Sequence, residues 1–141
     1  WLAIWIMSTR RNAHGTVTAN TNDQLDLKTW AAVREWTALS LTGHWFEING
    51  AIMYHKGCRA TWFCAPQTCK EENVDAFQGQ HAPDSTSFYL IDEGSGIGLK
   101  IYQAAEGGLT DGEPMVFLAG NCLRSDGEFH RITHGNGQDL W

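Results

Sequence analysis

Apolar side chains recur at a helical spacing between residues 23 and 38. They are Leu27, Trp30, Ala31, Val33 and Trp36. Intervals of about three and four residues place them on one face of a helix. Thr21 precedes this segment and Gln24 follows three residues later, a pattern that matches the capping box found at helix starts. The sequence therefore predicts an amphipathic helix over residues 23–38.

Two apolar runs flank the dipeptide Asn49-Gly50. Asn-Gly between such runs is a strong hairpin signal because both turn positions need positive φ angles. We therefore expect strands at residues 44–48 and 51–55. Residues 59–63 are expected to form a further strand, or the end of the same one after a break at Gly57.

Shorter signals complete the pattern. Strands are expected at residues 16–18, 87–91, 114–118 and 128–133, the last pairing back after a turn at residues 125–127. Residues 70–77 are compatible with a helix. Residues 97–105 fit either a strand or a helix, because their apolar positions match both periods.

The N-terminal segment Trp1–Met7 consists of apolar residues. It is too short to cross a bilayer, and no signal peptide with a charged first region and a cleavage site is visible. We expect a strand or a docked terminus here, with the cut end of a longer export or anchor segment as the alternative. Residues 1–15 are assigned to an N-terminal extension and residues 16–141 to a single domain.

Composition limits the class of protein. A chain of 141 residues with 43% hydrophobic content can bury one core. The formal net charge is -6, and no cluster of basic residues exceeds Arg10-Arg11. A general binder of phosphate backbones needs such a cluster, so we expect no nucleic-acid partner.

Four cysteines allow two disulfides, or one redox pair with two buried thiols. The number by itself does not fix the redox compartment. We favour a periplasmic or extracellular location over a cytoplasmic one.

Two of these cysteines, Cys64 and Cys69, lie five positions apart with Pro66 between them. Apolar and aromatic residues precede the pair, and the helix-compatible residues 70–77 follow it. A cysteine at a helix N-terminus is favoured as thiolate, because the helix dipole lowers its pKa. The segment is therefore a candidate for a reactive thiol.

The run Ala60-Thr61-Trp62-Phe63-Cys64-Ala65-Pro66-Gln67-Thr68-Cys69-Lys70-Glu71-Glu72 resembles the active-site sequence of thioredoxin-like thiol–disulfide oxidoreductases, A-T-W-C-x-P-C-K/R-x-E. The segment Gly112-Glu113-Pro114 before residues 115–118 is similar to that family's cis-proline loop. The resemblance covers about residues 51–141. It implies an α/β (α+β) domain with a central mixed sheet flanked by helices, thioredoxin-like in topology.

The resemblance also implies roles for individual residues. Cys64 would attack a substrate disulfide as thiolate, and Cys69 would resolve the mixed disulfide. Lys70 would favour the thiolate electrostatically. The substrate, a protein or peptide thiol or disulfide, would contact Trp62, Pro66 and Pro114. The family needs no cofactor and no metal for this reaction.

The spacing of the cysteine pair leaves alternatives open. On one regular helix, positions five apart point about 140° from one another, so the sulfurs meet only if Cys64 precedes the helix in a loop. Otherwise Cys64 and Cys69 form a static staple or remain buried thiols, as in a relative of this fold without redox activity.

A second resemblance gives a different fold. Gly43-His44-Trp45-Phe46-Glu47-Ile48 is similar to the G-x-W-Y/F-E-I signature of lipocalin-type proteins. It implies a closed antiparallel β-barrel that binds a small apolar ligand. This is our alternative for both fold and function.

The remaining motifs are weaker. Residues 92–99 look like the glycine boxes of kinase-type ATPases, but no partner box with asparagine lies upstream, and we interpret them as a flexible loop. Cys58, Cys64 and Cys69 with His81 or His55 lack the usual spacing of zinc ligands. His130 and His134 are interpreted as a solvated pair and Cys122 as a buried thiol at a strand end. We predict no metal site.

Overall fold

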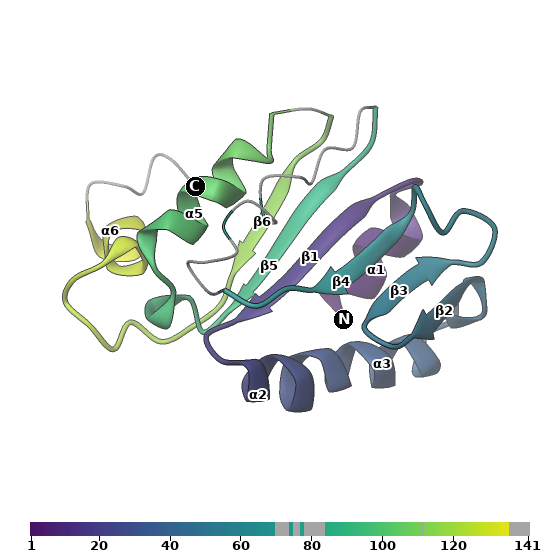
Figure 1. The fold of residues 1–141 in the computed structure, drawn as a ribbon, viewed down its shortest axis with the longest axis horizontal. Coiled ribbons are helices and arrows are strands. Elements are labelled where there is room, and N and C mark those ends of the chain that lie inside the picture. Colours follow the sequence, from purple (N-terminus) through teal and green to yellow (C-terminus); the bar gives the residue numbers. More distant parts are fainter. Residues whose placement is uncertain (70–73, 75–76, 78–83, 111, 136–141) are drawn as a thin grey trace.

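The computed structural model in Figure 1 describes residues 1–69, 74, 77, 84–110 and 112–135. A six-stranded sheet forms its centre, with the strand order β2-β3-β4-β1-β5-β6. The strands are β1 (His14–Ala19), β2 (Phe46–Asn49), β3 (Ile52–His55), β4 (Phe63–Pro66), β5 (Ser87–Asp92) and β6 (Met115–Leu118).

The sheet is mixed and open. The strands β4, β1, β5 and β6 run parallel, whereas β3 is antiparallel to both β2 and β4. Among the described residues β2 and β6 lie at the two edges and do not pair with each other. The expected mixed sheet in a single α/β domain is confirmed, and the alternative of a closed barrel is wrong. Trp45 lies in the short 3-10 helix η2 (Gly43–Trp45) before the edge strand β2.

Helices cover both faces of the sheet. On one face lie α1 (Leu2–Thr9) and α3 (Trp30–Leu39), the latter continuing from α2 (Asn22–Gln24) and the π-helical turn η1 (Leu25–Thr29). On the other face lie α5 (Leu99–Gly107) and α6 (Glu128–His134), beside the 3-10 turn η4 (Gly94–Gly96). Figure 1 shows these layers.

Alternation along β5 divides its side chains between two cores. Phe88 and Leu90 pack on the face covered by α1 and α3, whereas Tyr89 and Ile91 pack on the face covered by α5 and α6. This division follows from the two-residue period of a strand. A strand that is buried on both faces has a nearly continuous run of apolar residues in its sequence, as β5 does.

The predicted amphipathic helix is confirmed. Helical residues run from Asn22 to Leu39, and the Thr21 hydroxyl accepts a 3.2 Å hydrogen bond from the Gln24 amide, as expected for a capping box. Trp30 and Val33 are buried, whereas Trp36 is half exposed. The buried stripe is therefore narrower than the sequence pattern indicates.

The N-terminal segment is a helix packed on the sheet rather than a strand. Ile6 and Met7 of α1 are fully buried in the same core as β1 and α3. The Trp62 indole N–H donates a 3.0 Å hydrogen bond to the Met7 carbonyl. The assigned extension, residues 1–15, thus contains α1 and the first residues of β1. Within the described residues no helix has the length and apolar character needed to cross a bilayer.

The predicted hairpin is confirmed as β2 and β3, with its turn displaced by one residue. Asn49 pairs with Ile52, so the connecting residues are Gly50 and Ala51. Gly50 has a φ angle of 62°, the left-handed conformation that glycine adopts without a steric cost. The expected turn signal therefore located the hairpin, but Asn49 itself is the last residue of β2.

Other predictions need correction. Residues 128–133 form α6 instead of a strand, with Phe129 and Ile132 buried at a helical spacing of three. The segment 97–105 is resolved in favour of a helix, α5. The strand expected at residues 59–63 lies later, as β4. The helix expected over residues 70–77 falls outside the described residues except for Val74 and Phe77.

Candidate functional site at the carboxyl edge of the sheet

The parallel strands β4, β1, β5 and β6 end at one edge of the sheet (Figure 1). From β1 the chain crosses the face covered by α3, and the last strand of that excursion, β4, pairs beside β1. From β5 it crosses the opposite face through α5 to β6. The two excursions diverge between β1 and β5. In open α/β sheets, ligands bind outside the carboxyl ends of strands at such a switch point.

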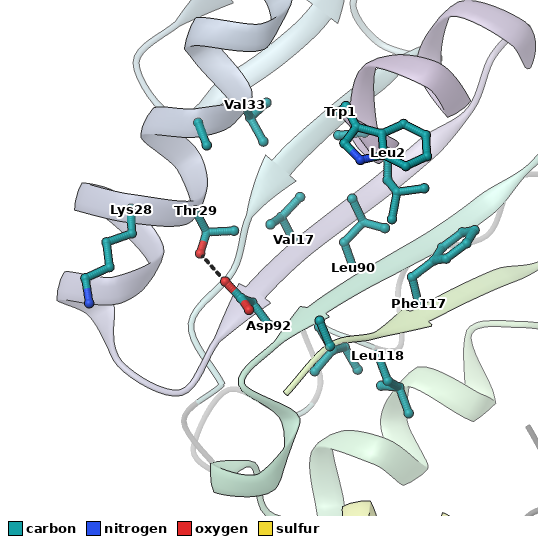
Figure 2. A pocket seen from close by; sticks show the side chains of 14 residues that line it. Trp1, Leu2, Val17, Lys28, Thr29, Val33, Leu90, Asp92, Phe117 and Leu118 are labelled. Carbon is teal, nitrogen blue, oxygen red and sulfur yellow. Dashed lines mark hydrogen bonds between the residues drawn. The ribbon is translucent and has the colours of Figure 1, made fainter. Parts of the chain in front are cut away.

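An acidic pair lies at this point. Asp92 is the last residue of β5, is half-buried, and is followed by the exposed Glu93. The Asp92 Oδ2 atom accepts a 2.8 Å hydrogen bond from the Thr29 hydroxyl (Figure 2), and its Oδ1 accepts a 3.0 Å bond from the Glu93 amide. Thr29 ends the π-helical turn η1, an irregularity that is frequent at functional sites. The Asp92 carboxylate is thereby fixed in orientation.

The backbone at Glu93 is strained. Its φ angle is 55°, which is costly for a residue with a side chain. The following residue is held from two sides, since the Gly94 amide donates a 2.9 Å bond to the Ala119 carbonyl and the Tyr102 hydroxyl donates a 2.8 Å bond to the Gly94 carbonyl. Such strain persists where the surroundings enforce it, and it concentrates at active sites.

Polar side chains converge around Glu93. A cavity of about 230 Å³ is lined by Asn20, Glu93, Ser95, Gly96, Asn121, Leu123 and Arg124. These residues follow the carboxyl ends of β1, β5 and β6. The backbone of Gly96 lies against the Asn20 amide, because a Cβ atom on Gly96 would meet the Asn20 Nδ2 at 2.4 Å. The site therefore combines a carboxylate, two amides and a guanidinium.

A larger cavity opens on the face covered by α1 and α3 (Figure 2). Its volume is about 450 Å³, and Val17, Leu90 and Phe117 form much of its apolar wall. Lys28, Thr29 and Asp92 supply polar groups at one end. An apolar pocket with a few polar groups is typical of small-molecule sites. Asp92 thus lines the larger cavity, and its neighbour Glu93 lines the smaller one.

Burial also shapes the proton chemistry next to this edge. It raises the pKa of the Tyr102 phenol well above its usual range, and the nearby Glu128 charge adds to the shift. The phenol therefore stays neutral and acts as the donor to Gly94.

The predicted redox residues are placed differently from expectation. Cys64 lies within β4 and is fully buried, so its expected position at the exposed start of a helix is wrong. Burial raises the pKa of the Cys64 thiol far above its usual range. Cys69 follows β4, is half-buried, and donates a 3.0 Å hydrogen bond from its thiol to the Ala19 carbonyl. Burial also raises the Cys69 pKa, and both cysteines are free thiols.

The other predicted site residues are not brought together. Trp62 precedes β4 and stacks on His55 at a ring distance of 4.3 Å, so it acts as a core residue. Pro66 ends β4 at the carboxyl edge, whereas the exposed Pro114 precedes β6 at the opposite edge. The peptide bond before Pro114 is trans, unlike that of the cis-proline loop to which the segment is similar. Lys70 and His81 lie outside the described residues.

Sequence reasoning missed Asn20, Asp92, Glu93 and Asn121. A signal was present, because the apolar run of β5 is followed at once by two carboxylates. The glycine run after them was interpreted as a flexible loop. In the structure it forms η4, with Gly94 buried against the Phe129 ring.

Comparisons with known proteins add one relationship. No family model matches the chain. A probable terminase, large subunit, of Enterobacteria phage P7 is 28% identical to it over 89 residues. This match covers 63% of the chain but 16% of the phage protein, so the chain corresponds to less than a fifth of that protein's length.

Proposed function

We propose that this chain supplies the acidic residues of a magnesium-dependent nucleoside triphosphate hydrolase within a terminase-like large subunit. One observation carries the proposal: Asp92 ends the parallel strand β5 at the switch point of the sheet, and Glu93 follows it directly. The similarity to the phage P7 protein supports the placement in a larger protein.

Asp92 fits a magnesium ligand. Mg²⁺ binds hard oxygen donors, usually one or two carboxylates together with substrate phosphates and water. In P-loop hydrolases an aspartate serves this purpose together with a hydroxyl of the phosphate-binding loop. The Thr29 hydroxyl and the Glu93 amide orient the Asp92 carboxylate at the open edge of the sheet. A bound Mg²⁺ would neutralise charge on the transferred phosphoryl group.

Glu93 fits a general base. Glu93 follows Asp92 in the chain, is exposed, and lines the cavity of about 230 Å³. In the proposed reaction the Glu93 carboxylate takes a proton from water while the water oxygen bonds to the γ-phosphorus. The bond between that phosphorus and the β–γ bridging oxygen breaks, which gives a nucleoside diphosphate and inorganic phosphate. Asn20, Asn121 and Arg124 line the same cavity and would position water and phosphate oxygens.

The proposal assigns only part of an active site to this chain. The sequence contains no G-x-x-x-x-G-K-S/T run, the loop that cradles phosphates in many such enzymes. Because the chain matches 16% of the phage protein, the activity of any whole protein that carries it is itself a proposal.

Thiol–disulfide exchange on a thioredoxin-like fold stays a prediction, but the geometry offers it less support. Nucleophilic attack requires an accessible thiolate, whereas the Cys64 thiol is buried and its pKa is raised. The expected absence of a nucleic-acid partner and the favoured periplasmic or extracellular location also stay predictions.

The test is phosphate release from Mg·ATP by the protein that carries this chain. Glu93→Gln should lower kcat by about 100-fold or more, the usual contribution of a general base, while ATP still binds. Asp92→Asn should raise the Mg²⁺ concentration needed for activity. Glu35→Gln, on an exposed position of α3, is the matched control and should change neither quantity. An unmodified protein that does not hydrolyse ATP, or full activity of Glu93→Gln, would refute the proposal.

A further inference from the structure

A cysteine and two histidines converge beside α6. Cys122 lies in the segment that follows β6, and His130 and His134 lie one turn apart on α6. One potential ligand atom from each of the three lies within 4.8 Å of the others. Across the described ranges, this is the one group of at least three His, Cys, Asp or Glu side chains that lie close enough to share a metal ion.

The arrangement follows from the local fold. Residues four apart on a helix share a face, and the rings of His130 and His134 are stacked with centroids 5.5 Å apart. The segment after β6 returns over this face, so that the Cys122 sulfur lies 3.8 Å from the Thr133 hydroxyl. The burial of Phe129 and Ile132 on the opposite side of α6 fixes which face the histidines present.

We propose that Cys122, His130 and His134 bind a zinc ion. Thiolate and imidazole are the ligands that zinc prefers, and they disfavour Mg²⁺ and Ca²⁺. Tetrahedral Zn–S and Zn–N bonds of about 2.3 and 2.05 Å require ligand atoms about 3.3–3.6 Å apart. Separations of at most 4.8 Å reach this geometry with side-chain movements of roughly 1 Å.

The surroundings suit such an ion. A cavity of about 400 Å³, lined also by Leu123, Arg124 and Ser125, adjoins the three side chains. It leaves room for water as the fourth ligand. The Thr133 hydroxyl lies 2.8 Å from the His134 Nδ1 atom and restrains that ring, as outer groups commonly do for metal-binding histidines.

Zinc at this position would act as a structural clamp. It would join the segment after β6 to α6, and residues of that segment, Asn121 and Arg124, line the cavity at Glu93. Phe129 of α6 packs against Gly94, which follows Glu93. The clamp would thus hold both sides of that cavity. The zinc site is inferred from its own ligands and does not depend on nucleotide hydrolysis.

Metal titration of the tag-free, chelator-treated chain tests the proposal. Cobalt(II) serves as a spectroscopic substitute for zinc. We expect one Co²⁺ per chain, with a sulfur-to-cobalt charge-transfer band and the intense visible bands of tetrahedral cobalt, and displacement by an equimolar amount of Zn²⁺. Zinc should also raise the thermal midpoint, since a ligand that binds the native state stabilises it.

Variants separate this site from adventitious binding. Cys122→Ser should abolish the charge-transfer band, and His134→Asn should weaken Zn²⁺ binding by at least 10-fold. Cys58→Ser and His44→Asn are controls of the same residue types elsewhere and should bind like the original chain. His130→Cys keeps a zinc-compatible ligand and should retain binding even if other variants fold poorly. A band that survives Cys122→Ser, or no stoichiometric Co²⁺ binding, would overturn the proposal.

Discussion

The hydroxyl of Thr29 donates a 2.8 Å hydrogen bond to the Asp92 carboxylate and thereby joins two residues 63 positions apart (Figure 2). Thr29 ends the π-helical turn that leads into α3, and Asp92 ends β5. The bond therefore ties the helix on one face to the strand that carries the acidic pair. Together with the 3.0 Å bond from the Glu93 amide to Oδ1, it holds both oxygens of the Asp92 carboxylate.

Loss of this bond should weaken the fold. Thr29→Val removes the donor and leaves a half-buried carboxylate with one bond fewer, so the free energy of unfolding should fall by about 1–2 kcal/mol. Urea denaturation monitored by tryptophan fluorescence measures the change. Thr29→Ser keeps the hydroxyl and should retain most of the stability. A stable Thr29→Val variant beside a destabilised Thr29→Ser variant would show that the methyl group, rather than the bond, matters.

Gly94 is required by close packing beneath the acidic pair. A Cβ atom at this position would lie 2.6 Å from the Phe129 ring and 2.8 Å from the Tyr102 hydroxyl. Gly94→Ala should therefore destabilise the protein by about 1–3 kcal/mol through overpacking.

Gly107 provides the matched control for that substitution. It is the last residue of α5, and a Cβ atom there meets nothing within 4 Å. Gly107→Ala should stabilise the chain by about 0.5–1 kcal/mol, because alanine is the better helix former and restricts the unfolded chain. Thermal unfolding of both variants measures whether each substitution raises or lowers the stability. A stable Gly94→Ala variant would show that α6 can shift away from η4.

Strain at Glu93 predicts a trade between stability and activity. Glu93→Gly removes the cost of a positive φ angle and should raise the free energy of unfolding by about 0.5–1 kcal/mol, after the extra chain entropy of glycine is subtracted. The same change should abolish phosphate release if Glu93 is the base. Asp84 has a φ angle of 60° but lies near the start of β5, at the opposite edge.

Asp84→Gly is therefore the control for the Glu93 variant. It should show a similar gain in stability without loss of activity. If both variants keep the full rate of phosphate release, neither the Glu93 side chain nor its left-handed conformation contributes to catalysis.

The elements that sequence reasoning located correctly carry local signals. The capping pair Thr21 and Gln24, with the apolar spacing after it, suffices to start and orient a helix. Gly50 similarly positions the β2–β3 hairpin, because few other residues adopt its φ angle without strain. These signals depend on neighbours within a few residues, so they can be recognised from the sequence without knowledge of the fold.

The errors arise where distant contacts decide. Residues 128–134 span only two helical turns, and in so short a segment the periods of helix and strand are hard to separate. Cys64 resembles a helix-start cysteine in sequence, but its segment pairs with the central strand β1, where Gly15 lies opposite Cys64. That pairing buries the thiol, and nothing in residues 59–72 alone indicates it.

The candidate site depends on strand order, which a single sequence does not reveal. Asp92 and Glu93 form a candidate site only because β5 lies next to β1 in a parallel sheet. This strand order places Asn20 and Asn121 at the same edge as the acidic pair. The approach of Cys122 to His134 likewise requires the return of the chain over α6. From the sequence alone, without knowledge of this topology, the acidic pair is interpreted as the start of a loop and the histidines as a solvated pair.

Burial of Cys64 predicts a pH dependence of stability. Its folded pKa is raised by burial far above the ordinary value of 9.0, so the unfolded chain loses this proton first as the pH rises. The contribution of Cys64 to the free energy of unfolding should be constant below about pH 8 and should then fall, by at most about 1.4 kcal/mol per pH unit above pH 9. Urea unfolding at pH 7, 9 and 10 measures the slope. Cys64→Ala should make this slope shallower by the contribution of that thiol, whereas Cys58→Ala serves as the control of the same residue type. In the folded protein Cys64 should also resist iodoacetamide, and rapid alkylation at pH 8 would contradict the buried placement and restore the case for a reactive thiol.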